Sequence, residues 1–453
     1  MQKNEIKDLT VGSPMKLILS FAIPMLFGFL FQQFYNMVDT IIVGKCLGVS
    51  ALAAVGSTGS INFMIIGFCT GACSGFAIPV AQKFGAGDYV GMRKFVANAG
   101  WLSAVFAAVM TTIVGFLCMD ILQWMNTPED IIQGAYDYIF IIFIGIPVTY
   151  LYNILAGIIR SLGDSKTPVY FLLLSSLMNI ALDFFTILVL GMGVSGPALA
   201  TVISQGISAV LCLIYMIRHY PILHMKQGEW QPDSRILCAL CGMGIPMGLQ
   251  YSITAIGTMI LQGAVNIFGS SVVAAFTAAS KVENLSTQTM PTLGTAIATY
   301  CGQNLGAGKY KRIYEGMRKG FFICIFISLA ASAICVFGGR FIVSWFVSNP
   351  SEEIFDYAMQ YLNTISFFML PLAWIFLYRN ALQGLNRGLV PMLSGVVEMV
   401  CRIIVIAVTL NPFGYWAVRL ASPITWLFTG ILLIVTYFIW EKQSRKKHSG
   451  SSD

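Results

Sequence analysis

Residues 23–40 read IPMLFGFLFQQFYNMVDT, an apolar run with a proline near its beginning and amides and a carboxylate near its end. With its apolar flanks, this run is long enough for an α-helix to cross the roughly 30 Å of hydrocarbon in a bilayer. An ionisable group inside such a run is costly to bury, so it marks a functional site by default. The stretch therefore predicts a transmembrane helix in which Asp39 has a function.

The whole chain has the composition of an integral membrane protein. Of its 453 residues, 57% are hydrophobic and only 10% are charged, with a mean hydropathy of +0.76. Soluble globular chains have about 25% charged residues. The apolar runs are about 20 residues long and predict helices, because the strands of a membrane barrel are about half that length. The predicted fold class is therefore an all-α integral membrane protein.

Twelve apolar runs are predicted to be transmembrane helices. They lie near residues 15–40, 50–80, 95–118, 131–157, 168–190, 195–218, 236–265, 271–302, 317–346, 354–382, 391–411 and 413–440. The longest polar interruption divides them into six and six. The predicted domains are an N-terminal six-helix lobe (1–218), a cytoplasmic linker (219–235), a C-terminal six-helix lobe (236–440) and a cytoplasmic tail (441–453).

The net charge of +7 is distributed over alternate loops. Basic residues fill three loops and the tail, at Lys83, Arg93, Lys94, Arg160, Lys166, Lys309, Lys311, Arg312, Arg318, Lys319, Lys442, Arg445, Lys446 and Lys447. The intervening loops carry mainly acids, at Asp120, Glu129, Asp130, Glu352, Glu353 and Asp356. By the positive-inside rule, both termini are cytoplasmic. We therefore expect a multi-pass protein of the cell membrane that contacts the lipid bilayer and binds no nucleic acid.

The two halves of the chain repeat. The segment AIPM at 22–25 recurs as GIPM at 244–247, and QKFGAGD at 82–88 recurs as QNLGAGK at 303–309, always 221 or 222 residues later. Each half has six spans, an even number, so both halves have the same orientation. They are expected to be related by a pseudo-two-fold axis along the membrane normal, the parallel-repeat architecture of some secondary transporters. The Gly-Ala-Gly segments are predicted to be tight turns, because no phosphate-loop lysine follows them.

At these residues the chain resembles the multidrug and toxic compound extrusion (MATE) family. The repeated Ile-Pro and Gly-Ala-Gly segments carry the resemblance together with YNMVDT at 35–40, GDSKTP at 163–168 and MNIALD at 178–183. The resemblance covers nearly the whole chain. It implies a V-shaped pair of six-helix lobes and export of organic cations against a proton or sodium gradient.

The candidate cation-coupling residues lie in the first half. By the helical rise, Asp39 lies about 36 Å along its span and Asp183 about 22 Å along its own. Asn179 is one turn from Asp183 on the same face. The resemblance implies that Asp39, Asn179, Asp183 and Thr201 match the proton-coupling site of the family branch with a first-lobe site, the DinF-like branch. Burial and a neighbouring carboxylate both favour the protonated form of a carboxyl group, which suits a proton carrier.

The second half does not repeat these acids. The positions aligned with Asp39 and Asp183 fall near Leu261 and Ile406, which favours coupling in the first lobe. An alternative is that Asp39 caps its span at headgroup level and that Asp183 only hydrogen-bonds a neighbouring helix.

Other polar residues are predicted to line a substrate pocket, namely Gln33, Tyr35, Asn36, Gln205 and Glu283. Glu283 either faces a central cavity, where it would attract a cationic substrate, or pairs with a polar neighbour. Protonation could bend the first span near Pro24, and Pro246 is its counterpart as a predicted hinge.

Glu398 and Arg402 lie four residues apart in one span, the favourable spacing and order for an ion pair on a helix. We interpret them as a structural pair in which each charge neutralises the other, facing the interior.

The predicted function is secondary antiport, with small organic and often cationic substrates, H+ or Na+ as the coupling ion, alternating access between the lobes, no cofactor, no metal and a monomeric state. A flippase for a lipid-linked precursor would need a basic groove, and few basic residues lie within the spans. A passive channel fits poorly with Asp39 and Asp183 in only one half. An enzyme would need a catalytic constellation, whereas the three histidines all lie outside the spans.

Overall fold

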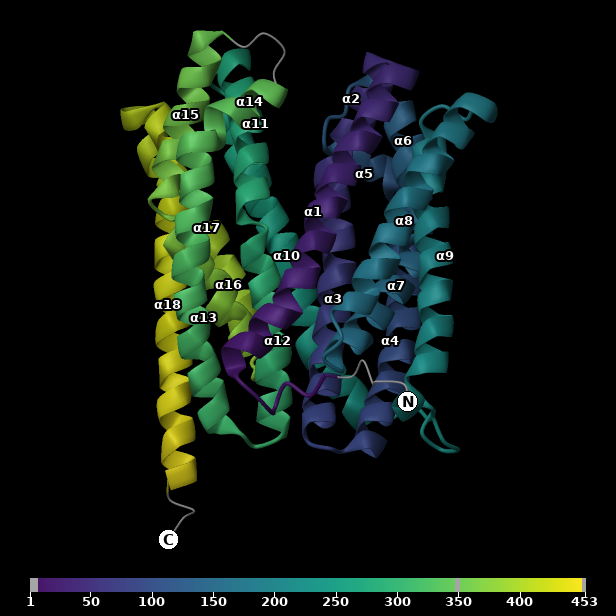
Figure 1. Ribbon diagram of the computed structural model, residues 1–453. Helices are drawn as coiled ribbons and strands as arrows, with labels where there is room; N and C mark the ends of the chain where they lie inside the picture. The colour runs from purple at the N-terminus through teal and green to yellow at the C-terminus, as the bar shows by residue number, and fades with distance from the viewer. Residues whose placement is uncertain (1–6, 347–350, 450–453) are drawn as a thin grey trace. The chain divides into compact units, whose positions relative to one another are not determined.

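The computed structural model describes residues 7–346 and 351–449, and this part of the chain is almost entirely helical, without a strand (Figure 1). The helices are α1 (Pro14–Leu47), α2 (Val49–Ser57), α3 (Gly59–Gly85), α4 (Tyr89–Phe116), α5 (Cys118–Trp124), α6 (Glu129–Ile144), α7 (Ile146–Ser161), α8 (Lys166–Phe184), α9 (Ser195–His219), α10 (Ser234–Asn266), α11 (Ser270–Thr287), α12 (Thr289–Gly306), α13 (Tyr310–Ala333), α14 (Gly339–Phe346), α15 (Glu352–Ser366), α16 (Met369–Gly384), α17 (Leu389–Phe413) and α18 (Tyr415–Ser449). Short helical turns are Phe185–Val189 and Ile334–Gly338, both π-helical, and the 3-10 turn Pro221–Leu223.

The helices form two compact units. Unit 1 comprises Met1–Asp8 and Phe27–Ser252, and unit 2 comprises Leu9–Leu26 and Ile253–Asp453. Both α1 and α10 therefore contribute to both units. The first part of α1 belongs to unit 2, although the predicted boundaries place it in the N-terminal lobe. The first part of α10 belongs to unit 1, although they place it in the C-terminal lobe. The lobe boundaries stay a prediction.

In the described part of the chain, nine helical segments are long and apolar enough to cross a membrane. Two bent pairs bring the number of candidate spans to eleven. These pairs are α6 with α7, bent by 46°, and α15 with α16, bent by 54°. The two pairs occupy equivalent places in the two sequence repeats, so the bend belongs to the repeated unit. The chain is a multi-pass membrane protein.

The run predicted near 271–302 is not among these candidate spans. It forms α11 and α12, two helices of 18 residues each that meet at Gln288. Lys281 and Glu283 interrupt the apolar character of α11. Charged residues within a membrane helix are commonly functional, so Glu283 is considered again below.

Unit 1 is held together partly by glycines of α3 that lie against the first part of α10. A Cβ atom on Gly71 would lie 2.6 Å from the carbonyl oxygen of Met247, and one on Gly75 would lie 2.6 Å from the Cα of Gly244. Small residues let helix backbones approach closely, which is how helices associate in membranes. The spacing of these glycines therefore serves helix packing.

The repeated Gly-Ala-Gly segments are tight turns in both units, as predicted. Gly87 and Gly308 have φ values of +70° and +69°, a left-handed conformation that glycine adopts without strain. In unit 1 the turn is closed by Asp88, which caps α4 by accepting from the Gly91 N–H at 2.8 Å and pairs with Lys83 at 2.7 Å. The Lys83 partner lowers the pKa of the Asp88 carboxyl group.

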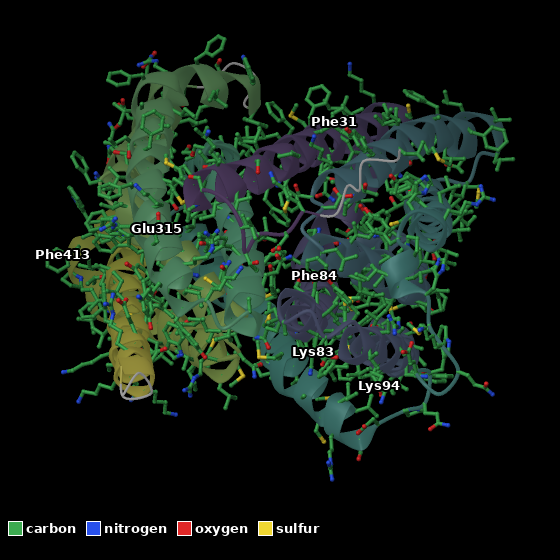
Figure 2. All side chains as sticks on the ribbon, turned by 60° about the horizontal axis from the view of Figure 1, so that its bottom comes forward. Phe31, Lys83, Phe84, Lys94, Glu315 and Phe413 are labelled. Carbon is green, nitrogen blue, oxygen red and sulfur yellow. The ribbon has the colours of Figure 1, made fainter. Side chains whose placement is uncertain are left out.

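The linker between the two sequence repeats is fixed to α4 within unit 1. Arg93 donates two hydrogen bonds to Glu229, at 2.7 and 2.8 Å, and Asp233 donates its backbone N–H to Asn98 at 2.8 Å. Hydrogen bonding to Arg93, reinforced by the Lys226 N–H, lowers the pKa of Glu229 to about 2. Figure 2 places Lys83 and Lys94 at the same end of unit 1.

The surface of each unit is rich in apolar side chains. Phe116 is 84% exposed in unit 1, and Phe337 is 86% exposed in unit 2. Phe413, labelled in Figure 2, points outward from unit 2. Large exposed apolar surfaces are unusual on soluble monomers and mark contact with membrane or partner. Here they fit the lipid contact that the composition predicts.

The two predicted hinge prolines lie inside continuous helices. Pro24 is within α1 and Pro246 within α10. A proline in a helix interior removes one backbone hydrogen bond and weakens the helix locally. Pro24 lies two residues before the end of the part of α1 that belongs to unit 2. The hinge role itself stays a prediction.

Candidate functional site

A polar cavity of about 250 Å³ lies within unit 1. Six helices, α1, α3, α6, α7, α8 and α9, contribute to its wall. The lining residues are Gln32, Tyr35, Asn36, Asp39, Asn62, Ile66, Tyr138, Ile142, Thr149, Tyr152, Leu172, Ser175, Ser176, Thr201, Val202, Ser204 and Gln205. Two features distinguish this set from an ordinary helix interface. Most of its members are polar, and none of them is basic.

One face of α1 supplies four of these residues at helical spacing. Gln32, Tyr35, Asn36 and Asp39 follow the pattern i, i+3, i+4, i+7, which places them on one stripe of the helix. Gln33, which the sequence predicted to line the pocket, is not among the lining residues of this cavity within the described chain. The same periodicity applied backward from Asp39 selects Gln32. The substrate-contact role of Gln33 stays a prediction.

The two carboxylates of the predicted coupling site meet beside this cavity. Asp39 from α1 lies within hydrogen-bonding reach of Asp183 from α8. Asp183 is fully buried. The Oδ1 atoms of both residues are buried without a hydrogen-bond partner among the described residues. Two facing carboxylates cannot both ionise without a large electrostatic cost, so they favour sharing a proton or binding a cation.

Asn179 connects this pair to α9. In the amide orientation that satisfies its neighbours, its Nδ2 donates to Asp183 Oδ2 at 3.2 Å. Its Oδ1 then accepts from both the backbone N–H and the hydroxyl of Thr201, at 3.1 Å each. Asn179 is 2% exposed. The structure thus brings together all four residues that the sequence predicted as the cation-coupling group.

The remaining predicted pocket residues of unit 1 also lie in the cavity wall. Tyr35 lines the cavity together with Thr201, and Gln205 accepts a hydrogen bond from Thr149 at 3.1 Å. Asn36 also lines the cavity, and its carbonyl oxygen accepts from Thr40 at 2.8 Å. Hydroxyl, amide and carboxylate groups therefore face the same space. Oxygen-rich walls of this kind suit a proton, a small cation or an organic cation with hydrogen-bond donors.

Several lining residues were missed by the sequence reasoning. Asn62, Tyr138 and Thr149 are contributed by α3, α6 and α7. Their signal is the presence of a polar side chain inside an apolar run. That signal is weak, because many such hydroxyl groups bond only to their own helix, as Thr112 does to the carbonyl oxygen of Ala108.

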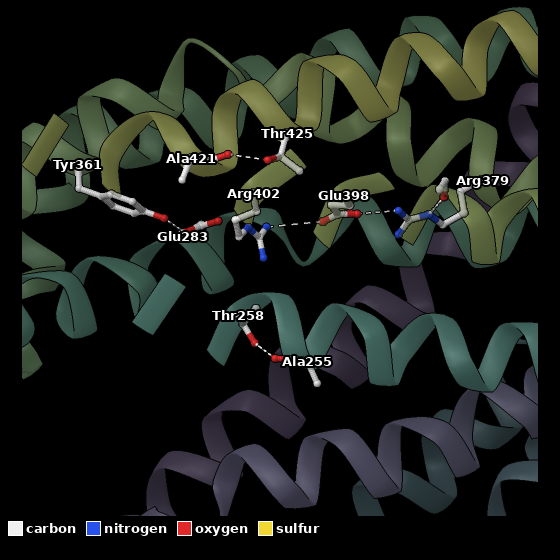
Figure 3. Close-up of polar contacts among 10 residues, drawn as sticks. Ala255, Thr258, Glu283, Tyr361, Arg379, Glu398, Arg402, Ala421 and Thr425 are labelled. Carbon is white, nitrogen blue, oxygen red and sulfur yellow. Dashed lines mark hydrogen bonds and ion pairs between the residues drawn. The ribbon is translucent and has the colours of Figure 1, made fainter. Parts of the chain in front are cut away.

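The predicted ion pair of α17 is present in unit 2, but it is part of a larger cluster (Figure 3). Arg402 lies 3.7 Å from Glu398, whereas Arg379 of α16 lies only 2.8 Å from the same carboxylate. Arg379 is thus the closer partner of Glu398, and the sequence reasoning had not assigned it. Glu283 accepts a hydrogen bond from Tyr361 at 2.9 Å, so it has a polar partner on α15.

Comparison with known proteins places this arrangement in a family. The MatE family model matches the chain twice, over residues 24–185 and 246–408. The second match begins 222 residues after the first, which agrees with the repeat in the sequence. Together the two matches cover well over half of the chain.

Curated relatives and solved structures agree. The chain is 30% identical over 429 residues to the probable multidrug resistance protein YpnP of Bacillus subtilis (strain 168), covering 94% of this chain and 91% of that protein. It is 23% identical over 435 residues to an FAD transporter of Shewanella oneidensis, with 92% of each chain covered. The fold matches the outward-facing structure of a multidrug resistance MATE family transporter with a TM-score of 0.91, at 22% identity, over 98% of this chain and 100% of that one. The chain therefore belongs to the MatE family of transporters and is not an enzyme.

Proposed function

We propose that this protein is a secondary active antiporter that exports amphipathic or cationic organic compounds in exchange for H+ or Na+. The observation that carries this proposal is the facing pair Asp39 and Asp183 beside a cavity without a basic lining residue. Many curated relatives, including the probable multidrug resistance protein YpnP, bear multidrug resistance names, which supports the substrate class.

The exchange follows from competition for the same carboxylates. When the pair holds a coupling ion, its negative charge is neutralised and a cationic substrate gains little from binding beside it. When the coupling ion leaves, the ionised pair attracts the substrate cation. Because each ligand weakens the binding of the other, their affinities are coupled reciprocally, as antiport requires. Asn179 and Thr201 would hold Asp183 in place in both states.

The other predicted residues have supporting roles in this proposal. Gln205, Tyr35 and Asn36 would orient the substrate by hydrogen bonds within the cavity of unit 1. Glu283 would provide a second negative charge for cations in unit 2. Alternation of access between two lobes would move the substrate, with Pro24 and Pro246 as hinges.

Several further properties belong to the same proposal. The protein would act as a monomer in the cell membrane, with both termini in the cytoplasm. No cofactor takes part. H+ is favoured over Na+ as the coupling ion because Asp39, Asn179, Asp183 and Thr201 match the first-lobe proton site of the family branch that the sequence resembles. Lys83 and Lys94, at one end of unit 1, would mark its cytoplasmic end.

An anionic cargo, such as a lipid-linked precursor, fits this cavity less well. Recognition of a pyrophosphate group normally uses arginine or lysine side chains. No lining residue of the cavity is basic, and two carboxylates lie beside it. Movement of a labelled lipid-linked precursor by the reconstituted protein would favour the flippase alternative.

The deciding experiment is transport of an organic cation by the protein in proteoliposomes, with proton and sodium gradients imposed separately. The wild type is expected to accumulate the cation under at least one gradient. Asp39→Asn and Asp183→Asn are expected to lose this gradient-driven transport. Asp120→Asn, which changes an exposed acid of α5, serves as the matched control and should transport normally. Normal transport by Asp39→Asn would refute the proposal.

A further inference from the structure

Unit 2 contains a row of four charged side chains within its helices (Figure 3). From one end to the other, the row consists of Arg379, Glu398, Arg402 and Glu283, and Tyr361 bonds to the last carboxylate. The side chains of Arg379, Glu398 and Arg402 are only 7%, 11% and 5% exposed. Two positive and two negative charges make the row neutral, as a row of charges shielded from water must nearly be.

The pairing within this row is uneven. Glu398 is held firmly by Arg379, which donates to it at 2.8 Å and also donates to Ser394 at 3.2 Å. Arg402 touches Glu398 only at 3.7 Å, beyond hydrogen-bonding distance. The Nε atom of Arg402 is buried and has no partner among the described residues. A guanidinium group carries five N–H donors, so Arg402 has donors to spare.

Arg402 has room for its guanidinium because α10 presents a glycine to it. A Cβ atom on Gly257 would lie 2.9 Å from Nη1 of Arg402. Any larger residue at this position would press on the guanidinium group. Gly257 therefore leaves space for the Arg402 guanidinium beside α10, and at least one of its N–H donors makes no hydrogen bond within the described residues.

Figure 3 shows Glu283 as the second carboxylate beside Arg402, and the charge of Arg402 acts on it. The groups that face Glu283 from the surrounding elements are Tyr361 of α15, Cys335 of the π-helical turn and Arg402 of α17. On its own helix, Lys281 is two residues away and exposed. Arg340 of α14 already forms an ion pair with the exposed Glu352 at 2.8 Å. Of these basic residues, Arg402 is therefore the one placed to neutralise the charge of Glu283.

We propose that Arg402 is a tethered cation that competes with a transported monovalent cation for Glu283. With Glu283 empty and ionised, Arg402 turns toward it. When a cation occupies Glu283, Arg402 returns to Glu398, which Arg379 keeps in place. This inference rests on the proposed antiport function and assigns to α17 the residue that sets cation affinity in unit 2.

The arrangement has a physical advantage for a carrier. A carboxylate shielded from water and left without a counter-ion is strongly unfavourable. A tethered arginine neutralises Glu283 after the cation has left, so the empty carrier never exposes an unpaired charge to its interior. It also lowers the affinity for the cation, because binding must displace Arg402, and this eases release.

Direct binding to the purified full-length protein tests the proposal. The probes are tetraphenylphosphonium, sodium and the proton, measured separately, since each offers Glu283 a single positive charge. Arg402→Gln leaves Glu398 paired with Arg379 and is expected to lower the Kd of one probe on the order of tenfold. Arg402→Lys keeps the charge and should bind nearly as the wild type does. The probe whose affinity rises identifies the competing cation.

The double variant Arg402→Gln/Glu283→Gln provides the matched control and should lose the whole gain in affinity. The inference is overturned if Arg402→Gln binds all three probes as the wild type does while remaining folded by thermal unfolding, or if the gain persists in the double variant. Should Arg402→Gln fail to fold, Glu283→Gln alone decides, because it must weaken binding of at least one of the three probes on the order of tenfold. Failure of the proposed function is distinguishable, since the wild type would then transport no organic cation under either gradient.

Discussion

The carboxylates of Asp39 from α1 and Asp183 from α8 lie within hydrogen-bonding reach of each other, and the Oδ1 atom of each is buried without a partner among the described residues. If these buried carboxylates served only stability, a positively charged side chain would be expected beside them. Here the group that donates to the Asp183 carboxylate, at 3.2 Å, is the neutral amide of Asn179. The pair is thus poised to take up a positive charge.

Asp183→Asn is expected to reduce transport without reducing the thermal stability of the protein. The substitution removes one of two facing carboxylates, so the thermal unfolding midpoint should stay the same or rise. Gradient-driven transport should fall on the order of tenfold or more, because the exchange of charge is lost. Unfolding of the purified variant and its transport in proteoliposomes would be compared. A marked drop in the midpoint would instead assign Asp183 a structural role.

Asn179→Leu is expected to reduce both stability and transport. The amide connects Asp183 to Thr201, and its loss removes the hydrogen bonds of Asn179 to the Asp183 carboxylate and to the Thr201 hydroxyl. Removing one side of a buried hydrogen bond costs about 1–3 kcal/mol. Thr112→Val, which alters an exposed hydroxyl bonded to its own helix, is the control and should change the free energy of unfolding by less than about 0.5 kcal/mol. Equal stabilities for the two variants would argue against the bridging role.

Glu398→Gln is expected to be far more destabilising than Glu352→Gln. Glu398 is the shared partner of two buried arginines, and breaking a buried pair on one side costs about 3–5 kcal/mol. Glu352 pairs with Arg340 at an exposed site, where an ion pair contributes about 0–1 kcal/mol. Thermal or denaturant unfolding of both variants measures the difference. Similar losses would mean that the charges of unit 2 are not as shielded as their exposure indicates.

Gly75→Ala is expected to disturb the contact between α3 and α10. The new methyl group would lie 2.6 Å from the Cα of Gly244 and 2.7 Å from the carbonyl oxygen of Met243, and overpacking of this kind costs about 1–3 kcal/mol. Gly100 of α4 has no atom within 4 Å of its Cβ position, so Gly100→Ala should stabilise the helix by up to about 1 kcal/mol. Opposite signs in the change of unfolding free energy would confirm the close approach. A neutral Gly75→Ala variant would contradict it.

The bond between Arg93 and Glu229 is expected to hold the linker throughout the physiological pH range. The folded pKa of Glu229 is lowered to about 2, below its unfolded value of about 4.3. Its contribution to stability is therefore complete above about pH 4.3 and is lost as the pH falls through about 2. Hydrogen exchange of residues 221–233 should show constant protection from pH 8 to about pH 5 and loss only in stronger acid. Glu229→Gln should remove this acid step, and an opening between pH 7 and 5 would disprove the assignment.

Much of the fold could be predicted from the sequence because its signals are local. Hydrophobic runs select membrane helices, and the repeated Gly-Ala-Gly segments predicted turns whose glycines have nearly the same φ. Part of the candidate site could also be predicted from the sequence, because an acid such as Asp39 is easily recognised in an apolar run. Residues such as Asn62 and Thr149 could not be assigned in the same way, since a polar side chain inside a span has several possible partners.

The sequence by itself determined that this is a duplicated, all-helical membrane protein with Asp39 and Asp183 in the first half, because hydropathy, periodicity and repetition are properties of short segments. Only the tertiary structure decided which side chains meet. It brought Asp39 to Asp183, placed Gln32 in the cavity wall, and placed Arg379 closer to Glu398 than Arg402 is. These choices depend on the rotation of each helix about its axis and on its packing against helices distant in sequence. No local pattern records them.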